Sequence, residues 1–440
     1  MVSASLRRRR LIWIAVGIAL LMVGALPIVL LLADTRPGGG SRGARAEDAS
    51  LRTLDAVPAP DAVAADSVSD YSRASAMIPS PPGGTTVTTS DWCTGAVGGD
   101  RDIASGVGLE VAQWVARSRP ALATARECRG RQGRLLLDDD EVPDFDARGW
   151  DPNRLGWLLV AAGWIAMQAG DPEEALARAE DALAAEASLL QSAGCHQLID
   201  GPRRVAAAEQ LARAAMGSGG ISSEHLRAYA RRVEEYEDRI PSLTHLGTVD
   251  AAHTLARVHR MTTQQIEDVA VRSHPYQSLT SEELEKLNVG QEIKWDADVE
   301  AHIDAMLLGR SRTARRVEDR LARIVDALDD TDAGALQKTL DQAEAKLEGD
   351  ELAREVMPPR EVWPYVRRGY RGVLMDYRHT RLLAATEAYR LDTNGAPSAA
   401  EDLVPEYLSA VPIDPYTEGP LSVPPTPAGS APGTEDVGGQ

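Results

Sequence analysis

The stretch VEDRLARIVDALDDTDAGALQKTLDQAEAKL, residues 317–347, carries the pattern that decides the fold class. Its apolar side chains recur at spacings of four, three and four residues on each side of a polar turn at 329–332. They are Val317, Leu321, Ile324 and Leu328 before the turn, and Leu336, Leu340, Ala343 and Leu347 after it. Such spacing places apolar residues on one face of a helix. The stretch therefore predicts an antiparallel helical hairpin with short coiled-coil-like packing.

Helix start signals support the same reading elsewhere in the chain. In Asp171-Pro172-Glu173-Glu174, we expect Asp171 to be the N-cap, Pro172 the first helical residue and Glu174 the acid of a capping box. Apolar residues at spacings of three and four recur between the two low-complexity ends of the chain. The predicted fold is mainly α, with an α-helical domain over 91–390.

Composition sets limits on the partners of this domain. The chain has 440 residues, 47 Lys plus Arg against 66 Asp plus Glu, and a net charge of −19. Its length favours one folded domain with appendages, or two domains. Nucleic acid is not an expected partner, because affinity for phosphate backbones comes from clustered cationic side chains.

An apolar segment near the N-terminus predicts a membrane anchor. Residues 11–33 form an uncharged run of 23 residues, which as a helix spans about 34 Å, enough for a bilayer core. Four arginines, Arg7 to Arg10, precede it directly. By the positive-inside rule, residues 1–10 stay in the cytoplasm and the rest of the chain is exported. We expect a single-pass protein of the cell membrane that contacts the lipid bilayer through 11–33.

A cleaved signal peptide is the alternative reading of this segment. Signal peptides have a shorter apolar stretch that ends at a small-x-small site. Such a site, Ala44-Arg45-Ala46, lies well beyond the apolar run, so an uncleaved anchor is favoured.

Two segments have the composition of disordered chain. Residues 34–90 are rich in Gly, Pro, Ser, Thr, Ala and Asp, and 424–440 are similar. Little apolar surface is available there to offset the entropy of ordering the backbone. We expect a flexible linker over 34–90 and a disordered tail over 424–440.

Residues 159–187 resemble one tetratricopeptide repeat, a helix-turn-helix unit. Gly163 matches the small residue at the helix crossing, Gly170-Asp171 the turn, and Ala175 and Ala182 the small positions of the second helix. A second copy is not recognisable, and repeat arrays need about three units to bury a core. A generic alanine-rich hairpin is favoured over a true repeat array. If the resemblance holds, it implies peptide or protein binding in a concave groove.

The C-terminal region shows a more specific likeness. The runs AYRLDTNGAP at 388–397, LVPEYL at 403–408 and VPIDPY at 411–416 occur in succession. Together, residues 385–422 resemble the C-terminal region of the type II secretion major pseudopilins. The resemblance implies that a long helix ends near Gly395 and that a small α/β appendage follows over 391–423, with Asp414-Pro415 starting a turn.

The chain also departs from that family. Pseudopilins begin with a short leader and a membrane helix that carries an early glutamate, whereas the helix expected at 11–33 contains none. The separation of about 350 residues between that helix and the C-terminal runs is also foreign to a pilin. We therefore interpret 391–423 as a structural module, without filament assembly.

Catalytic signatures are scarce. The sequence contains no phosphate-cradling glycine loop, no His-Glu-x-x-His and no Cys-x-x-Cys. His245, His253 and His259 do not share one helix face, and the acidic run 138–141 is read as a solvated loop. No catalytic residue is assigned, and no metal or cofactor is expected. Enzymatic activity stays open, with a non-enzymatic role favoured.

Three cysteines allow one disulfide in an oxidising compartment. They are Cys93, Cys128 and Cys195, which permit three pairings. We expect Cys93 to pair with Cys128, because the chain emerging from the linker needs fastening to the helical body. For Cys195, which precedes His196, a buried thiol is favoured over a nucleophile.

These features predict a membrane-anchored, exported helical protein of the bacterial envelope that acts as a scaffold or binds other proteins. One alternative is an accessory component of a type II secretion or pilus-like system. Another is an uncharacterised envelope hydrolase, which would need converging His and Asp or Glu side chains in a deep pocket.

Overall fold

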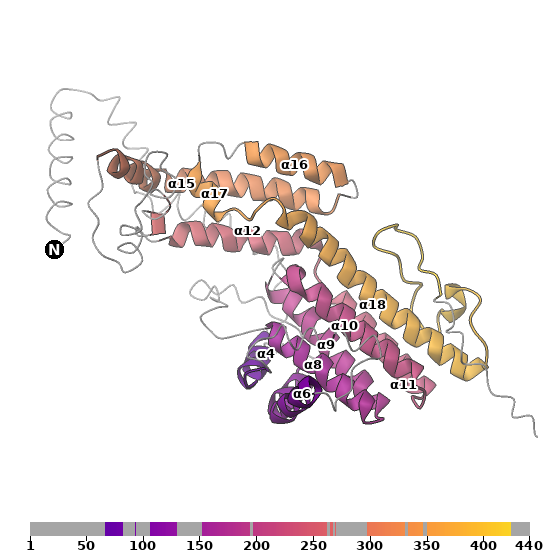
Figure 1. Cartoon of the computed structure of the whole chain (residues 1–440). Helices are drawn as coiled ribbons and strands as arrows, with labels where there is room; N and C mark the ends of the chain where they lie inside the picture. Colours follow the sequence, from indigo (N-terminus) through magenta and orange to yellow (C-terminus); the bar gives the residue numbers. More distant parts are fainter. Residues whose placement is uncertain are drawn as a thin grey trace, which may run out of the picture. The chain divides into compact units, whose positions relative to one another are not determined.

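The computed structural model describes 67–81, 93, 106–129, 152–193, 197–261, 265–266, 269, 297–330, 333–345 and 350–423. The fold is mainly α, as predicted. The helices, shown in Figure 1, are α4 (Ser67–Ala76), α6 (Gly106–Arg117), α7 (Arg119–Glu127), α8 (Pro152–Gln168), α9 (Pro172–Ala193), α10 (Gln197–Gly217), α11 (Ser223–Asp238), α12 (Leu243–Arg260), α15 (Ala297–Leu328), α16 (Ala333–Ala345), α17 (Glu351–Val356) and α18 (Val362–Thr393), followed by a 3-10 helix at Ala400–Leu403.

The predicted hairpin at 317–347 is confirmed in α15 and α16. Val317, Leu321, Ile324 and Leu328 are each at most 1 % exposed, and Leu336, Leu340 and Ala343 are buried opposite them. Leu347 lies outside the described residues. Helix α12 covers another side of α15, where a Cβ at Gly247 would lie 2.9 Å from Val325 Cγ2.

Helices α8 and α9 form the hairpin expected at 159–187. The Glu174 amide donates to Asp171 Oδ1 across 3.0 Å, so the predicted N-cap is confirmed. The second half of the capping box is wrong, because the Asp171 amide donates to the carbonyl oxygen of Ala166. The Glu174 carboxylate instead pairs with Arg126 and Arg178.

Helix α18 packs along both α10 and α11 (Figure 1). A Cβ at Gly369 would overlap the backbone carbonyl of Leu198, which explains why glycine stands at this crossing. Farther along, Arg378 pairs with Glu237 and Arg381 with Glu234, across 2.6 and 2.7 Å. The long helix is therefore an integral wall of the helical body.

The structure corrects the predicted linker, because α4 lies within 34–90. The side chains of Tyr71, Ala74 and Ile78 follow at spacings of three and four, and all are buried against the other helices. The first described helix thus lies at Ser67–Ala76, inside the range predicted as a linker.

The C-terminal segment differs from the expected α/β appendage. Helix α18 ends with Asn394 in the left-handed conformation at φ 53°. In place of a sheet, the described residues beyond it contain the 3-10 helix and one isolated antiparallel bridge between Ile413 and Pro420. The Asp414 turn occurs where expected, with Asp414 Oδ1 accepting from the Tyr416 amide across 2.7 Å.

Several predictions fall on parts of the chain that are not described. The anchor at 11–33 and the tail from 424 are among them. Among the helices that are described, none is both long enough and apolar enough to cross a bilayer.

Candidate functional site

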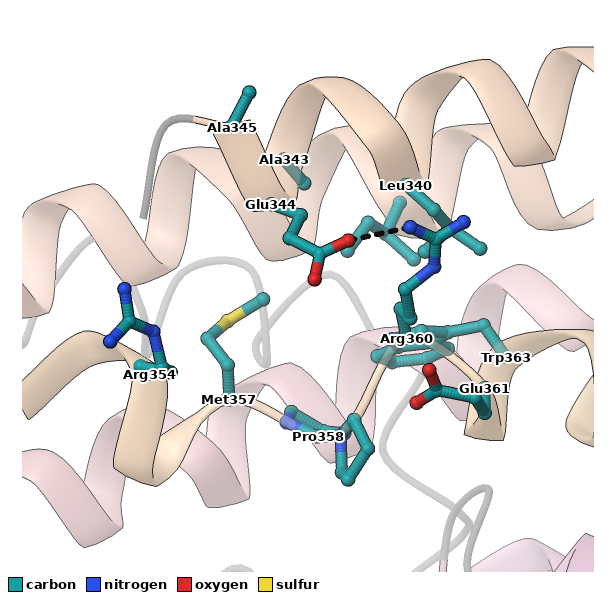
Figure 2. A pocket seen from close by; sticks show the side chains of 12 residues that line it. Leu340, Ala343, Glu344, Ala345, Arg354, Met357, Pro358, Arg360, Glu361 and Trp363 are labelled. Atoms are coloured by element: carbon teal, nitrogen blue, oxygen red, sulfur yellow. Dashed lines mark hydrogen bonds and ion pairs between the residues drawn. The ribbon is translucent and has the colours of Figure 1, made fainter. Parts of the chain in front are cut away.

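A groove opens between α16, α17 and the start of α18, with a volume of about 570 Å³ (Figure 2). Its floor is mainly apolar and its rim carries charges. We call it the α16–α18 groove. The residues that line it are Ile324, Leu340, Ala343, Glu344, Ala345, Arg354, Met357, Pro358, Pro359, Arg360, Glu361 and Trp363.

One buried carboxylate positions the short helix α17 beside this groove. Asp350 Oδ1 accepts from the Ala353 amide across 3.0 Å, which makes Asp350 the N-cap. The same carboxylate pairs with Arg316 across 2.9 Å and accepts from the Thr313 hydroxyl across 3.2 Å, both on α15. Helix α17 is therefore fastened to α15 at its first turn.

Two prolines shape the side of the groove that joins α17 to α18. Met357 caps α17 with extended backbone, φ −68° and ψ 135°, as expected for a residue before proline. Pro358 and Pro359 follow, and the Val362 amide donates to the carbonyl oxygen of Pro359. The chain thus turns rigidly into α18, and Figure 2 shows Met357 and Pro358 between Arg354 and Arg360.

The floor of the groove centres on Trp363, which is 1 % exposed. Leu340, Ile324 and Met357 are also buried there. The indole Nε1 of Trp363 has no hydrogen-bond partner among the described residues. The base of the groove is therefore apolar.

Arg360 holds the rim in place. Its guanidinium pairs with Glu344 across 2.6 Å and with Asp341 across 2.8 Å, both on α16. The hydrogen bond to Glu344, together with the negative charge of Asp341, raises the pKa of the Arg360 guanidinium further above its ordinary value. The dashed line in Figure 2 marks the Arg360–Glu344 contact across the mouth of the groove.

The lining suits binding better than catalysis. It includes no histidine, cysteine, serine, threonine or tyrosine, so it offers no common nucleophile or imidazole base. Glu344 is paired with Arg360, which leaves Glu361 as the second carboxylate of the lining. The convergence of His and Asp or Glu that a hydrolase would need is not found in this groove.

The two cysteines of the predicted disulfide are both buried. Cys93 Sγ lies 3.9 Å from the carbonyl oxygen of Trp157, and Cys128 Sγ lies 3.0 Å from that of Thr124. Each sulfur is thus placed as a thiol donor to a carbonyl, and the Cys93–Cys128 disulfide stays a prediction. Cys195 lies outside the described residues.

The other candidate ligands do not come together. His245 is half-buried on α12, and burial lowers its pKa. The side chains of His253 and His259, and the acidic run 138–141, lie outside the described parts of the chain. Within those parts, no cluster of three or more His, Cys, Asp or Glu side chains could hold a metal ion.

The groove was not predicted from the sequence. A local signal was present in Met357-Pro358-Pro359, which indicates a helix end and a rigid turn before the Trp363 helix. The remaining lining comes from residues as distant as Ile324, and no short motif connects them.

Comparison of the chain with protein-family models, curated proteins and solved structures found no match.

Proposed function

We propose that this protein is a membrane-anchored scaffold of the bacterial envelope, which binds a segment of a partner protein in the α16–α18 groove. The observation that carries the proposal is the combination of a buried tryptophan floor with a charged rim in one open groove of about 570 Å³. Apolar contact with a few fixed polar groups is the usual composition of a binding site.

The groove suits a peptide more than a compact metabolite. Its apolar floor is bounded by both charge signs, Arg354 and Glu361 among them. An extended segment with one apolar side chain can place that side chain over Trp363 and pair its flanking polar groups with the rim.

The proposed location rests on the sequence. The apolar run 11–33, with Arg7 to Arg10 before it, supports a single-pass anchor with the N-terminus in the cytoplasm and the helical body outside. The anchor would hold the groove near the membrane.

Site-specific photo-crosslinking in the full chain tests the groove. A photo-reactive amino acid placed at Ala345, which is exposed and lines the groove, should give a discrete protein adduct in native membranes. The same group at Lys338, exposed on α16 but outside the lining, is the matched control. Indistinguishable adducts from the two positions, or none from Ala345, would refute the proposal.

A second measurement addresses the enzyme alternative directly. The purified full chain is screened against hydrolase substrates, with Glu361→Gln as the test variant. A turnover that this variant abolishes would replace the scaffold proposal with an enzymatic one.

A second candidate function is an accessory role in a type II secretion or pilus-like system. It is favoured by the C-terminal segment, where the Asp414 carboxylate organises the turn by accepting from the amides of Tyr416 and Thr417. Recovery of the full chain from membranes together with secretion components would support this role. Their consistent absence from such preparations would count against it.

A further inference from the structure

One exposed face of α18 carries two arginines that form no ion pair with a carboxylate in the described parts of the chain. Tyr365 and Arg368 are exposed on this face, and Arg371 is half-buried close by. Tyr416, from the turn after Asp414, joins them and is 47 % exposed. We call Tyr365, Arg368, Arg371 and Tyr416 the basic-aromatic strip.

The arginines of the strip differ from three other arginines of α18. Arg378, Arg381 and Arg390 each pair with a glutamate at 2.5 to 2.7 Å. Neither Arg368 nor Arg371 forms an ion pair with a carboxylate in the described parts of the chain. Arg368 instead lies over the Tyr365 ring, 5.9 Å from its centroid. Two guanidinium groups thus remain available for anionic groups of a ligand.

Tyr416 is brought to these arginines by the C-terminal turn. A Cβ at Gly372 would lie 3.8 Å from the Tyr416 hydroxyl, so the phenol reaches the surface of α18. Burial and the negative charge of Asp376 raise the pKa of Tyr416, and the positive charges of Arg371 and Arg368 partly oppose that shift. Both guanidinium charges therefore act on the end of the Tyr416 side chain.

The strip continues from the rim of the α16–α18 groove. Glu361 lines the groove, and Tyr365 and Arg368 follow it at spacings of four and three residues. These spacings place the three residues on one helix face. A ligand that leaves the groove past Glu361 would meet the strip next.

We propose that the basic-aromatic strip binds an acidic segment of a protein partner. Carboxylates of that segment pair with Arg368 and Arg371, since guanidinium groups match carboxylates in shape and charge. Tyr365 and Tyr416 supply the flat apolar contacts that typically anchor such interfaces. The strip would thus be a second binding surface beside the groove, and its partner would be acidic.

Peptide binding to the full chain in neutral-lipid nanodiscs tests the strip. The probe is a fluorescein-labelled dodecapeptide with four glutamates and one leucine, and its matched peptide carries glutamine for each glutamate. Fluorescence anisotropy should show about tenfold weaker binding of the glutamine peptide, because the ion pairs are lost.

Charge-matched variants localise the effect. Arg368→Glu with Arg371→Glu should weaken binding of the acidic peptide about tenfold or more. Arg312→Glu with Arg323→Glu makes the same change of charge on α15, where both arginines are exposed, and should change affinity less than about twofold. Unchanged thermal unfolding of both variants verifies that the fold is intact.

Three results would overturn the proposal. The first is equal loss in the two variants, which would indicate a general charge effect. The second is equal affinity for the glutamate and glutamine peptides. The third is binding to phosphatidylglycerol vesicles through the same two arginines without binding to the peptide, which would make the strip a lipid-contacting surface. The groove is not involved in these measurements, so the strip can fail while crosslinking from Ala345 still supports the scaffold proposal.

Discussion

Arg204 donates from Nε and Nη2 to the two carboxylate oxygens of Glu186, each across 2.9 Å. The two side chains are only 2 % and 3 % exposed, so a charged pair is buried between α9 and α10. Asn153 on α8 accepts a further hydrogen bond from Arg204. Glycines make the space for this pair, because a Cβ at Gly156 would overlap Arg204 and one at Gly201 would overlap Glu186.

Replacing one of these glycines should destabilise the fold. Gly201→Ala is expected to lower the free energy of unfolding by about 1–3 kcal/mol, the usual range for overpacking in a filled core. Gly309→Ala is the control, since no atom of the described residues lies within 4 Å of a Cβ there; in mid-helix it should instead stabilise by about 0.5–1 kcal/mol. Urea denaturation measures both, and equal effects would contradict the packing argument.

Replacing one partner of the buried pair should lower the free energy of unfolding more than replacing both. Arg204→Met leaves the Glu186 charge buried without its guanidinium, at an expected cost of about 3–5 kcal/mol. Adding Glu186→Met removes the stranded charge, so the double variant should be more stable than Arg204→Met alone. A double variant that unfolds at still lower denaturant concentration would refute this account.

The Tyr407 hydroxyl should help to hold the C-terminal segment against α18. The Tyr407 hydroxyl donates to Asp392 Oδ2 across 3.0 Å, and its ring meets Tyr389 edge to face with centroids 5.5 Å apart. Tyr407→Phe should lower the free energy of unfolding by about 1 kcal/mol, because only the hydrogen bond is lost. Hydrogen exchange of the amides over 403–408 would measure the local loosening. Tyr365→Phe, at an exposed ring, should leave that exchange unchanged.

The stability of the α10–α18 contact should depend on the ionisation of Asp376. Burial, reinforced by repulsion from Glu209, raises the pKa of the Asp376 carboxyl to about 7. The folded protein therefore holds a proton that the unfolded chain releases above about pH 4, so this group costs stability as the pH rises from about 4 to 7. Above about pH 7 the loss of stability no longer changes with pH.

Asp376→Asn should remove this cost. The variant is expected to gain about 1–3 kcal/mol over the natural protein at pH 8 and much less at pH 4.5. Glu209→Gln should also increase the free energy of unfolding at pH 8, by a smaller amount, because it removes the repulsion of the Asp376 carboxylate. Denaturation curves at the two pH values measure the difference. A gain that does not depend on pH would show that Asp376 acts through packing alone.

Much of the helical architecture could be predicted because it depends on local periodicity. Val317 and Leu340 are buried in the expected hairpin, and Asp171 caps α9 as its sequence indicates. Helix α4 escaped prediction because its short apolar face, Tyr71 and Ala74 with Ile78 just beyond the helix end, stands among serines that are typical of linkers. That face becomes stable only once other helices cover it.

The candidate sites depend on tertiary contacts that no local pattern encodes. The α16–α18 groove joins Leu340 to Trp363 through a turn whose direction depends on the Asp350 contacts with α15. Likewise, Arg368 and Arg378 look alike in the sequence, and only the position of α11 gives Arg378 its glutamate. Predicting either site would have required the packing of α18 in advance.

Helix α18 has a mechanical consequence. It begins at the groove with Trp363, packs along α10 and α11, and ends at Asn394 before the C-terminal segment. Its 32 residues form one continuous helical rod of about 48 Å. A displacement at one end would therefore be transmitted to the other as a shift or rotation of the whole rod. Capture of a partner at the groove would then move the Gly372 surface on which Tyr416 rests, as well as the end of α18 before the C-terminal segment.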